Sequence, residues 1–362
     1  MPFLYFYFLV TVLLLFVSLS QPYKVVFFKK LTFLFISLII LGLTSLRYRT
    51  GTDWPGYEDY FIRNDFSWEL GWSYLNYQIK TLGLSVEYVF FIVAIFSLSI
   101  KFYIFSKYSK YVLMAVLLSI PFIVNKDFGT IRQGLAIAIC FSSTSFIINR
   151  KCLKFMVTVL IAAQFHMGAM FFLLAYPLAT FNLNKNVILM VTAFCVIFSM
   201  LSSVNDILTY VFSNFFGGSR IAYKILKYST YSDGYDSVYA VSAFDVGTLK
   251  KSFNIVLLYF LGAFGERFYR NFDYKVFVNL SLFGYWVFFI FSDINQLRRL
   301  VGFFELYEIL LFCNFAYMVK SNNLRVAILL YSWLLSLISL YGYTKSYPEY
   351  LGHYDSLLRF VL

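Results

Sequence analysis

The stretch FMVTVLIAAQFHMGAMFFLLAYPLATF, residues 155–181, decides how this chain folds. It is apolar except at Gln164-Phe165-His166, where two polar side chains interrupt the run and small residues follow. Because polar groups are costly in hydrocarbon, the interruption predicts a hairpin of two short helices, 155–165 and 167–181, with His166 at its apex. A single tilted helix is the alternative, and the two interpretations place everything downstream on opposite sides of a membrane.

The whole chain has the composition of a membrane protein. Hydrophobic residues make up 60% of it and charged residues 13%, with a mean hydropathy of +0.73, so a soluble chain could not cover its surface with polar groups. Spans need about 20 apolar residues. With the hairpin, the apolar runs predict an all-α polytopic protein of about 12 transmembrane helices. The other runs are 3–19, 27–46, 86–105, 111–125, 131–149, 187–204, 253–269, 275–292, 299–319 and 325–342.

The first run, 3–19, has neither a basic region before it nor a small-residue cleavage site, so we expect a retained helix. Charge then favours the hairpin. Basic, acid-free loops follow the first and fifth spans, as is typical of the cytoplasmic side. With the hairpin, only Glu266 and Asp273 of the 18 acidic residues fall on that side. We therefore expect one domain over 1–362, with both termini and the segments 47–85 and 205–252 on the outer face.

Composition also narrows the chemistry. The four cysteines form no C-x-x-C pair and there are two histidines, so we expect neither a metal site nor a cofactor. The net charge of +12 lies mostly in short loops, where basic residues fix topology and contact anionic lipid. No nucleic-acid partner is expected.

The first outer segment holds several candidate site residues. Arg49 and Asp53 flank a Gly-Thr turn that is followed by Tyr57, and Arg47 precedes them, with a headgroup anchor as its alternative role. Glu69 lies between two tryptophans, a combination that is common in sugar binding and equally common at a membrane interface.

The next outer turn, 125–130, precedes another apolar run. Thr130 is in place to cap the following helix, which puts Arg132 and Gln133 in its first turn. An arginine beside unpaired backbone N–H groups forms an anion site. A simple ion pair between Arg132 and Asp127 is the alternative.

Three further candidates share the predicted outer face. His166 can act as a base or donate to phosphate, the alternative being a satisfied core histidine. Arg298 and Arg299 precede a span that carries Glu305, and an internal salt bridge would explain them too. Arg220 belongs to a basic strip around 219–228, which a helix on the membrane surface explains nearly as well.

Four motifs resemble those of the EpsG-like branch of the Wzy-type polysaccharide polymerases, in the family's order. They are Arg49-Thr50-Gly51-Thr52-Asp53 followed by Tyr57, Ile131-Arg132-Gln133-x-Leu135-Ala136, Phe165-His166, and Arg299-Leu300-x-x-Phe303-Phe304. Gly168-Ala169 and Phe303-Phe304, where tyrosine is frequent, depart mildly from the pattern.

The resemblance implies a GT-C-like glycosyltransferase of the bacterial inner membrane with its active site facing the periplasm. Such an enzyme joins lipid-linked repeat units of O-antigen, capsule or exopolysaccharide. The donor is a glycan on undecaprenyl pyrophosphate, and the acceptor is a hydroxyl of a new lipid-linked unit. A chain-length regulator and a flippase are the implied partners.

On this basis Arg132 and Arg299, helped by Arg49, bind the donor pyrophosphate, and either His166 or Asp53 removes the acceptor proton. The remaining substrate-binding candidates are Glu69, Tyr57, Gln133, Arg298 and Arg220. An O-antigen ligase, which uses the same donor, is one alternative function. A transporter or flippase of lipid-linked sugar is another, although it predicts internal repeats and polar residues near the membrane midplane. A membrane acyltransferase fits less well.

Overall fold

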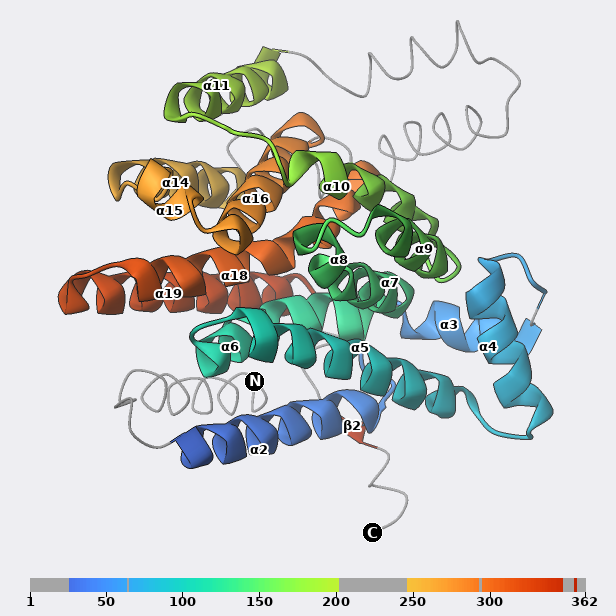
Figure 1. The fold of residues 1–362 in the computed structure, drawn as a ribbon. Helices are drawn as coiled ribbons and strands as arrows, with labels where there is room; N and C mark the ends of the chain where they lie inside the picture. The colour runs from blue at the N-terminus through green and yellow to red at the C-terminus, as the bar shows by residue number, and fades with distance from the viewer. Residues whose placement is uncertain (1–25, 64, 202–245, 293–294, 348–354, 357–362) are drawn as a thin grey trace, which may run out of the picture. The chain divides into compact units, whose positions relative to one another are not determined.

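The computed structural model of the chain describes residues 26–63, 65–201, 246–292, 295–347 and 355–356 (Figure 1). Its residues form two compact units, Met1–Tyr176 with Ile309–Leu362, and Pro177–Glu308. The expected single domain stays a prediction. The expected span 3–19, the strip around 219–228 and Arg220 lie outside the described residues.

The first unit contains most of the described helices. In chain order its elements are α2 (Val26–Ser45), β1 (Arg47–Tyr48), α3 (Trp54–Arg63), α4 (Leu70–Thr81), α5 (Val86–Tyr108), α6 (Val112–Ile123), the π-helix η1 (Val124–Gly129), α7 (Ile131–Ser142), α8 (Thr144–Ile148), α9 (Cys152–Ala163), the 3-10 helix η2 (Met167–Leu174), α19 (Asn322–Ser346) and β2 (Asp355–Ser356).

The second unit contains α11 (Lys185–Leu201), α14 (Val246–Phe260), α15 (Glu266–Tyr269), α16 (Phe272–Ile290), α17 (Asn295–Arg298) and the 3-10 helix η3 (Arg299–Val301). Two helices, α10 (Ala175–Leu178) and α18 (Gly302–Met318), have residues in both units.

Five described helical stretches are long and apolar enough to cross a membrane: Val86–Tyr108, Val112–Gly129, Ile131–Ile148, Arg299–Met318 and Asn322–Ser346. Shorter apolar helices accompany them at Lys30–Ser45, Cys152–Ala163, Met167–Leu178 and Lys185–Ser199. An all-α membrane protein is thereby confirmed. The count of about 12 spans and the GT-C-like fold stay predictions.

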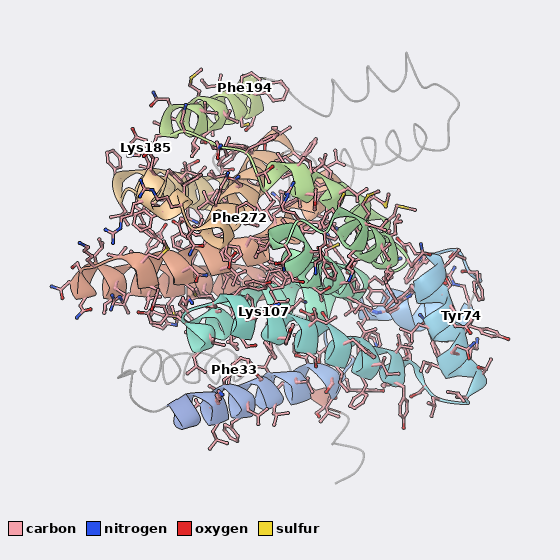
Figure 2. The ribbon with its side chains drawn as sticks, in the orientation of Figure 1. Phe33, Tyr74, Lys107, Lys185, Phe194 and Phe272 are labelled. Carbon is pink, nitrogen blue, oxygen red and sulfur yellow. The ribbon has the colours of Figure 1, made fainter. Side chains whose placement is uncertain are left out.

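Large aromatic side chains are exposed on an apolar helix, as expected of a surface that faces lipid, and also on a helix of the segment 47–85. Tyr74 on α4 is 61% exposed and Phe194 on α11 is 64% exposed (Figure 2).

The hairpin around His166 is confirmed. Helix α9 ends at Ala163, and η2 begins at Met167. The ring of Phe155, near the start of α9, lies 5.9 Å from that of Phe172 and 5.2 Å from that of Tyr176. Only a reversal of the chain brings these rings together, so a single tilted helix over 155–181 is excluded.

Two expected elements are wrong. The span 253–269 is instead α14, which begins seven residues earlier at Val246 and ends at Phe260. Gly262, with φ +74°, turns the chain in the left-handed region before α15, a helix ending that glycine makes easy. The expected turn at 125–130 is the π-helix η1, which continues α6. Its charged side chains find partners within the protein and need no exposed loop.

The segments of the first unit that the charges placed on the outer face meet at one end of that unit, and which side of the membrane they face stays a prediction. β1 pairs with β2 in antiparallel register, Arg47 opposite Ser356 and Tyr48 opposite Asp355. Gly51, with φ +127°, lies so close to the carbonyl of Phe128 that a Cβ would overlap its oxygen.

The other end of α5 is basic. There the amide of Asn314 donates to the carbonyl of Tyr108 at 2.9 Å, and the Arg325 guanidinium donates to the carbonyls of Ala316 and Val319 at 3.2 and 3.0 Å. Lys110 lies over the ring of Tyr317. The first unit therefore has one end rich in basic residues and another that carries the outer segments.

Candidate active site

An ion pair between α7 and the N-terminus of α4 forms the centre of the site. Arg132, in the first turn of α7, donates from Nη1 to Oε2 of Glu69 at 2.5 Å. Glu69 occupies the N-cap position of α4. The two side chains are 21% and 19% exposed, so the pair is largely shielded from water while remaining reachable. The alternative pairing of Arg132 with Asp127 does not occur.

The second oxygen of Glu69 connects this pair to the hairpin apex. Oε1 accepts a hydrogen bond from the backbone N–H of Met167 at 3.1 Å, one residue after His166. The start of α4 also contacts the hairpin through its backbone, because the N–H of Trp72 donates to the carbonyl of Gln164 at 3.1 Å. The two segments pack so closely that a Cβ on Gly71 would lie 2.8 Å from the Gln164 Cβ. The sequence prediction that Arg132 and His166 lie on the same side is thus confirmed.

His166 is held in one orientation. It is the N-cap residue of η2, and its Nδ1 accepts a hydrogen bond from the backbone N–H of Gly168 at 3.1 Å. In a neutral imidazole an accepting Nδ1 leaves the proton on Nε2. In the neutral imidazole, Nε2 is therefore a hydrogen-bond donor.

Aromatic rings pack around the guanidinium. The Arg132 Cζ lies 3.8 Å from the ring centroid of Trp68, and the Tyr60 ring stacks on the same indole at 4.0 Å with an interplanar angle of 4°. Such stacking fixes the plane of the guanidinium. Arg132 Nε is buried and has no hydrogen-bond partner among the residues that the structure describes.

Tyr57 and Asp53 adjoin this group from α3. Tyr57 is 4% exposed, and burial raises the pKa of its phenol to about 12, with the negative charge of Asp53 adding to the rise. The charge of Arg132 and hydrogen bonding with Arg132 oppose the shift in pKa. The phenol therefore stays neutral near pH 7, and its electrostatic coupling places the Asp53 carboxylate and the Arg132 guanidinium in one neighbourhood.

The remaining arginines of the first outer segment have different surroundings. Arg49 is exposed and pairs with Glu58 at 3.3 Å. Arg47 is 1% exposed, donates to the carbonyls of Thr50 and Thr44 at 3.2 and 2.5 Å, and lies over the ring of Phe128. Arg47 is thus no headgroup anchor but supports the turn that precedes Asp53.

Beneath the site, a buried ion pair fixes the π-helix. Lys101 donates to both Asp127 oxygens at 2.7 Å, and the Ser97 hydroxyl donates to Oδ1 at 2.5 Å. The neighbouring Lys126 donates to Gln133 Oε1 at 2.9 Å. Gln133 is 1% exposed, which turns this substrate-binding candidate toward the protein interior. Thr130 occupies the N-cap position of α7, but its side chain makes no capping hydrogen bond.

The model of the EpsG family matches residues 30–355 of the sequence. The chain belongs to the EpsG family. Comparison with curated proteins and with solved structures gave no significant match. EpsG membership indicates a polysaccharide polymerase-type role, and with the apolar helices it indicates a membrane protein of polysaccharide biosynthesis.

Three of the four motifs that resembled the EpsG-like family converge in the first unit, through Asp53, Arg132 and the backbone beside His166. The fourth lies in the second unit, where Arg298 ends α17 and Arg299 begins η3. That this fourth motif and Arg132 belong to one site stays a prediction.

Sequence reasoning missed two participants of this EpsG-family site, the Met167 backbone donor and the Lys101–Asp127 pair, and it interpreted Trp68 as a sugar-binding ring rather than as the ring on which Arg132 stacks. Lys101 carried a usable signal, because an ionisable side chain inside an apolar run demands a buried partner. The Met167 donor and the role of Trp68 depend on contacts between segments far apart in the chain, which no local pattern reveals.

Proposed function

We propose that this protein polymerises oligosaccharide repeat units carried on a polyprenyl pyrophosphate, at the periplasmic face of the bacterial inner membrane. A hydroxyl oxygen of the acceptor repeat attacks the anomeric carbon of the donor. The bond from that carbon to the phosphate oxygen breaks, and its electron pair leaves with the pyrophosphate. The observation that carries the proposal is the Glu69–Arg132 pair beside the His166 apex in a member of the EpsG family.

Arg132 stabilises the departing pyrophosphate. Its Nη1 donates a hydrogen bond to Glu69, and stacking on the Trp68 ring fixes the orientation of the guanidinium plane. A cation that is fixed before the reaction needs no reorganisation when negative charge develops, and removing such a group typically costs about 10²–10³ in rate. Glu69 acts as a positioning residue because one of its oxygens accepts from Arg132 and the other from the Met167 backbone.

Asp53 is the base in this proposal and His166 the donor. Accepting the acceptor proton requires a free lone pair, which the Asp53 carboxylate has, whereas the Nδ1 lone pair of His166 already accepts the Gly168 N–H. His166 Nε2–H instead donates to a phosphate oxygen or a sugar hydroxyl. Arg49 supplies further positive charge for the pyrophosphate. Arg298 and Arg299, in the second unit, stay candidates from the sequence.

Extension of a purified lipid-linked repeat by the purified protein tests this function. The expected product is a ladder of lengthening glycans on the lipid, and Asp53→Asn is expected to abolish it. Glycan transfer only to a lipid A core acceptor would identify a ligase. Movement of the lipid-linked repeat across vesicles without new glycosidic bonds would identify a transporter. Either result would overturn the proposal.

A further inference from the structure

A second cationic cluster lies in the second unit, on the α14 face that carries Thr248, Lys251 and Asn254. These positions are three residues apart, so they share one face of the helix. Lys251 is 6% exposed, Thr248 5% and Asn254 0%. A buried polar stripe on a helix of a membrane protein requires polar partners.

Lys251 has no acceptor among the residues that the structure describes. Its Nζ lies 5.4 Å from the ring centroid of Tyr285 and 4.9 Å from that of Phe288, both on α16, and it takes part in no hydrogen bond or ion pair there. Ring faces offset only part of the cost of removing an ammonium from water. The surroundings of this ammonium are largely apolar, and an anion bound from outside the described residues would stabilise it.

Two further features support the same conclusion. The Thr248 hydroxyl is buried and lacks a hydrogen-bond partner within the described ranges. The Arg298 guanidinium lies 5.7 Å from the centroid of the same Phe288 ring, so two cations gather at one ring. Together they offer an ammonium, a guanidinium and a hydroxyl, which is the donor set that a phosphate uses.

The nearby carboxylates are engaged elsewhere. Oε1 of Glu308 accepts from the amide of Asn254 at 2.9 Å, and the same amide donates to the Tyr285 hydroxyl at 3.2 Å. Glu308 and Glu305 interact electrostatically with the neighbouring Lys250. Among the described residues, neither carboxylate forms a hydrogen bond or an ion pair with the Lys251 ammonium.

We infer that Lys251, with Thr248 and Arg298, binds the phosphate group of a lipid. This inference rests on the proposed function: the ligand is the pyrophosphate of one of the two lipid-linked substrates that a polymerase must hold. An anionic phospholipid headgroup offers the same chemistry from another source. Sequence patterns could not reveal the site, because Lys251 stands in an ordinary Lys-Lys pair.

Lipid binding to the full-length protein in detergent, measured by native mass spectrometry, tests this site. The probes are undecaprenyl diphosphate, phosphatidylglycerol and uncharged phosphatidylcholine. Lys251→Gln is expected to weaken binding of the diphosphate lipid about tenfold, the usual range for a lost charge-assisted hydrogen bond. Lys251→Arg, which keeps the charge, is expected to retain it and to show that the site still folds.

Lys185→Gln is the matched control, because Lys185 is an exposed lysine at the start of α11 in the same unit (Figure 2). If Lys251→Gln and Lys185→Gln weakened binding of the diphosphate lipid equally, the proposed site would be wrong. If Lys251→Gln weakened phosphatidylglycerol as strongly as the diphosphate lipid, the site would stand and its ligand would be a headgroup. Because this assay needs no turnover, a protein that binds through Lys251 but makes no polymer would refute the proposed function alone.

Discussion

Glu69 and Arg132, 63 positions apart, form an ion pair of 2.5 Å whose carboxylate also accepts the backbone N–H of Met167 at 3.1 Å. One side chain thus fixes both a cation and the backbone beside a histidine. The consequence is that the geometry of the site depends on Glu69, each of whose oxygens already accepts a hydrogen bond from the protein.

Replacing Glu69 by Gln is expected to lower kcat about 10–100-fold while changing KM less than about threefold, since the amide keeps the shape but loses the charge that holds Arg132. Steady-state extension of a lipid-linked repeat measures both constants. Asp59→Asn, which removes an exposed carboxylate that pairs with Arg63 and lies outside the site, serves as the control. A rise in KM with unchanged kcat would show that Glu69 binds sugar instead.

Replacing His166 by Asn is expected to leave the hairpin folded but to reduce the extension rate about 100-fold, within the usual range for a lost hydrogen-bond donor to a developing charge. The Asn oxygen can replace Nδ1 as the acceptor for Gly168, whereas nothing replaces the Nε2 donor. The rate, together with the elution volume of the purified variant, checks this. Wild-type activity in a folded His166→Asn protein would remove His166 from the mechanism.

Breaking the buried Lys101–Asp127 pair should destabilise the protein strongly. Lys101→Met leaves a carboxylate uncompensated, which typically costs about 3–5 kcal/mol. Unfolding of the detergent-solubilised protein, followed by helical circular dichroism, measures the change. The double variant Lys101→Met/Asp127→Leu should recover most of the loss, because an apolar pair of similar volume needs no compensation. If the double variant were no more stable than the single one, the pair would not act as a unit.

The glycines around Asp53 should differ sharply in their tolerance of a side chain. Gly51→Ala is expected to destabilise by more than about 1–2 kcal/mol, since the backbone is left-handed there and the new Cβ meets the Phe128 carbonyl. Gly56→Ala, in helix α3 with nothing within 4 Å of the new Cβ, should be neutral or stabilising. Equal unfolding midpoints for the two variants would contradict this view of the turn.

Part of the fold follows from the sequence because apolar length and charge asymmetry are strong signals. The run 131–149 closely matches α7 and α8, and the interruption at Gln164–His166 correctly predicts the hairpin. Those signals also place Asp53, Glu69, Arg132 and His166 on one face before any contact is known.

Other features depend on tertiary contacts that sequence patterns do not encode. Asn125–Gly129 has the composition of a turn, yet it is helical because Lys101, from another helix, neutralises Asp127. Glu69 has the composition of a sugar-binding residue beside tryptophan, and its partner proves to be Arg132. The two-residue pairing of β1 with β2 is too short to leave any periodicity.

The central claim is that the Arg132 guanidinium, held by Glu69 and Trp68, drives departure of the lipid pyrophosphate. Single-turnover extension of a purified lipid-linked repeat tests it most directly, with wild type, Arg132→Ala and Arg132→Lys compared at saturating substrate. The account predicts a rate about 10²–10³ lower for Arg132→Ala, with little recovery in Arg132→Lys, because an ammonium can neither stack as a plane on the indole nor offer the planar fork of donors that a guanidinium presents. A folded Arg132→Ala protein that extends the glycan at the wild-type rate would contradict it.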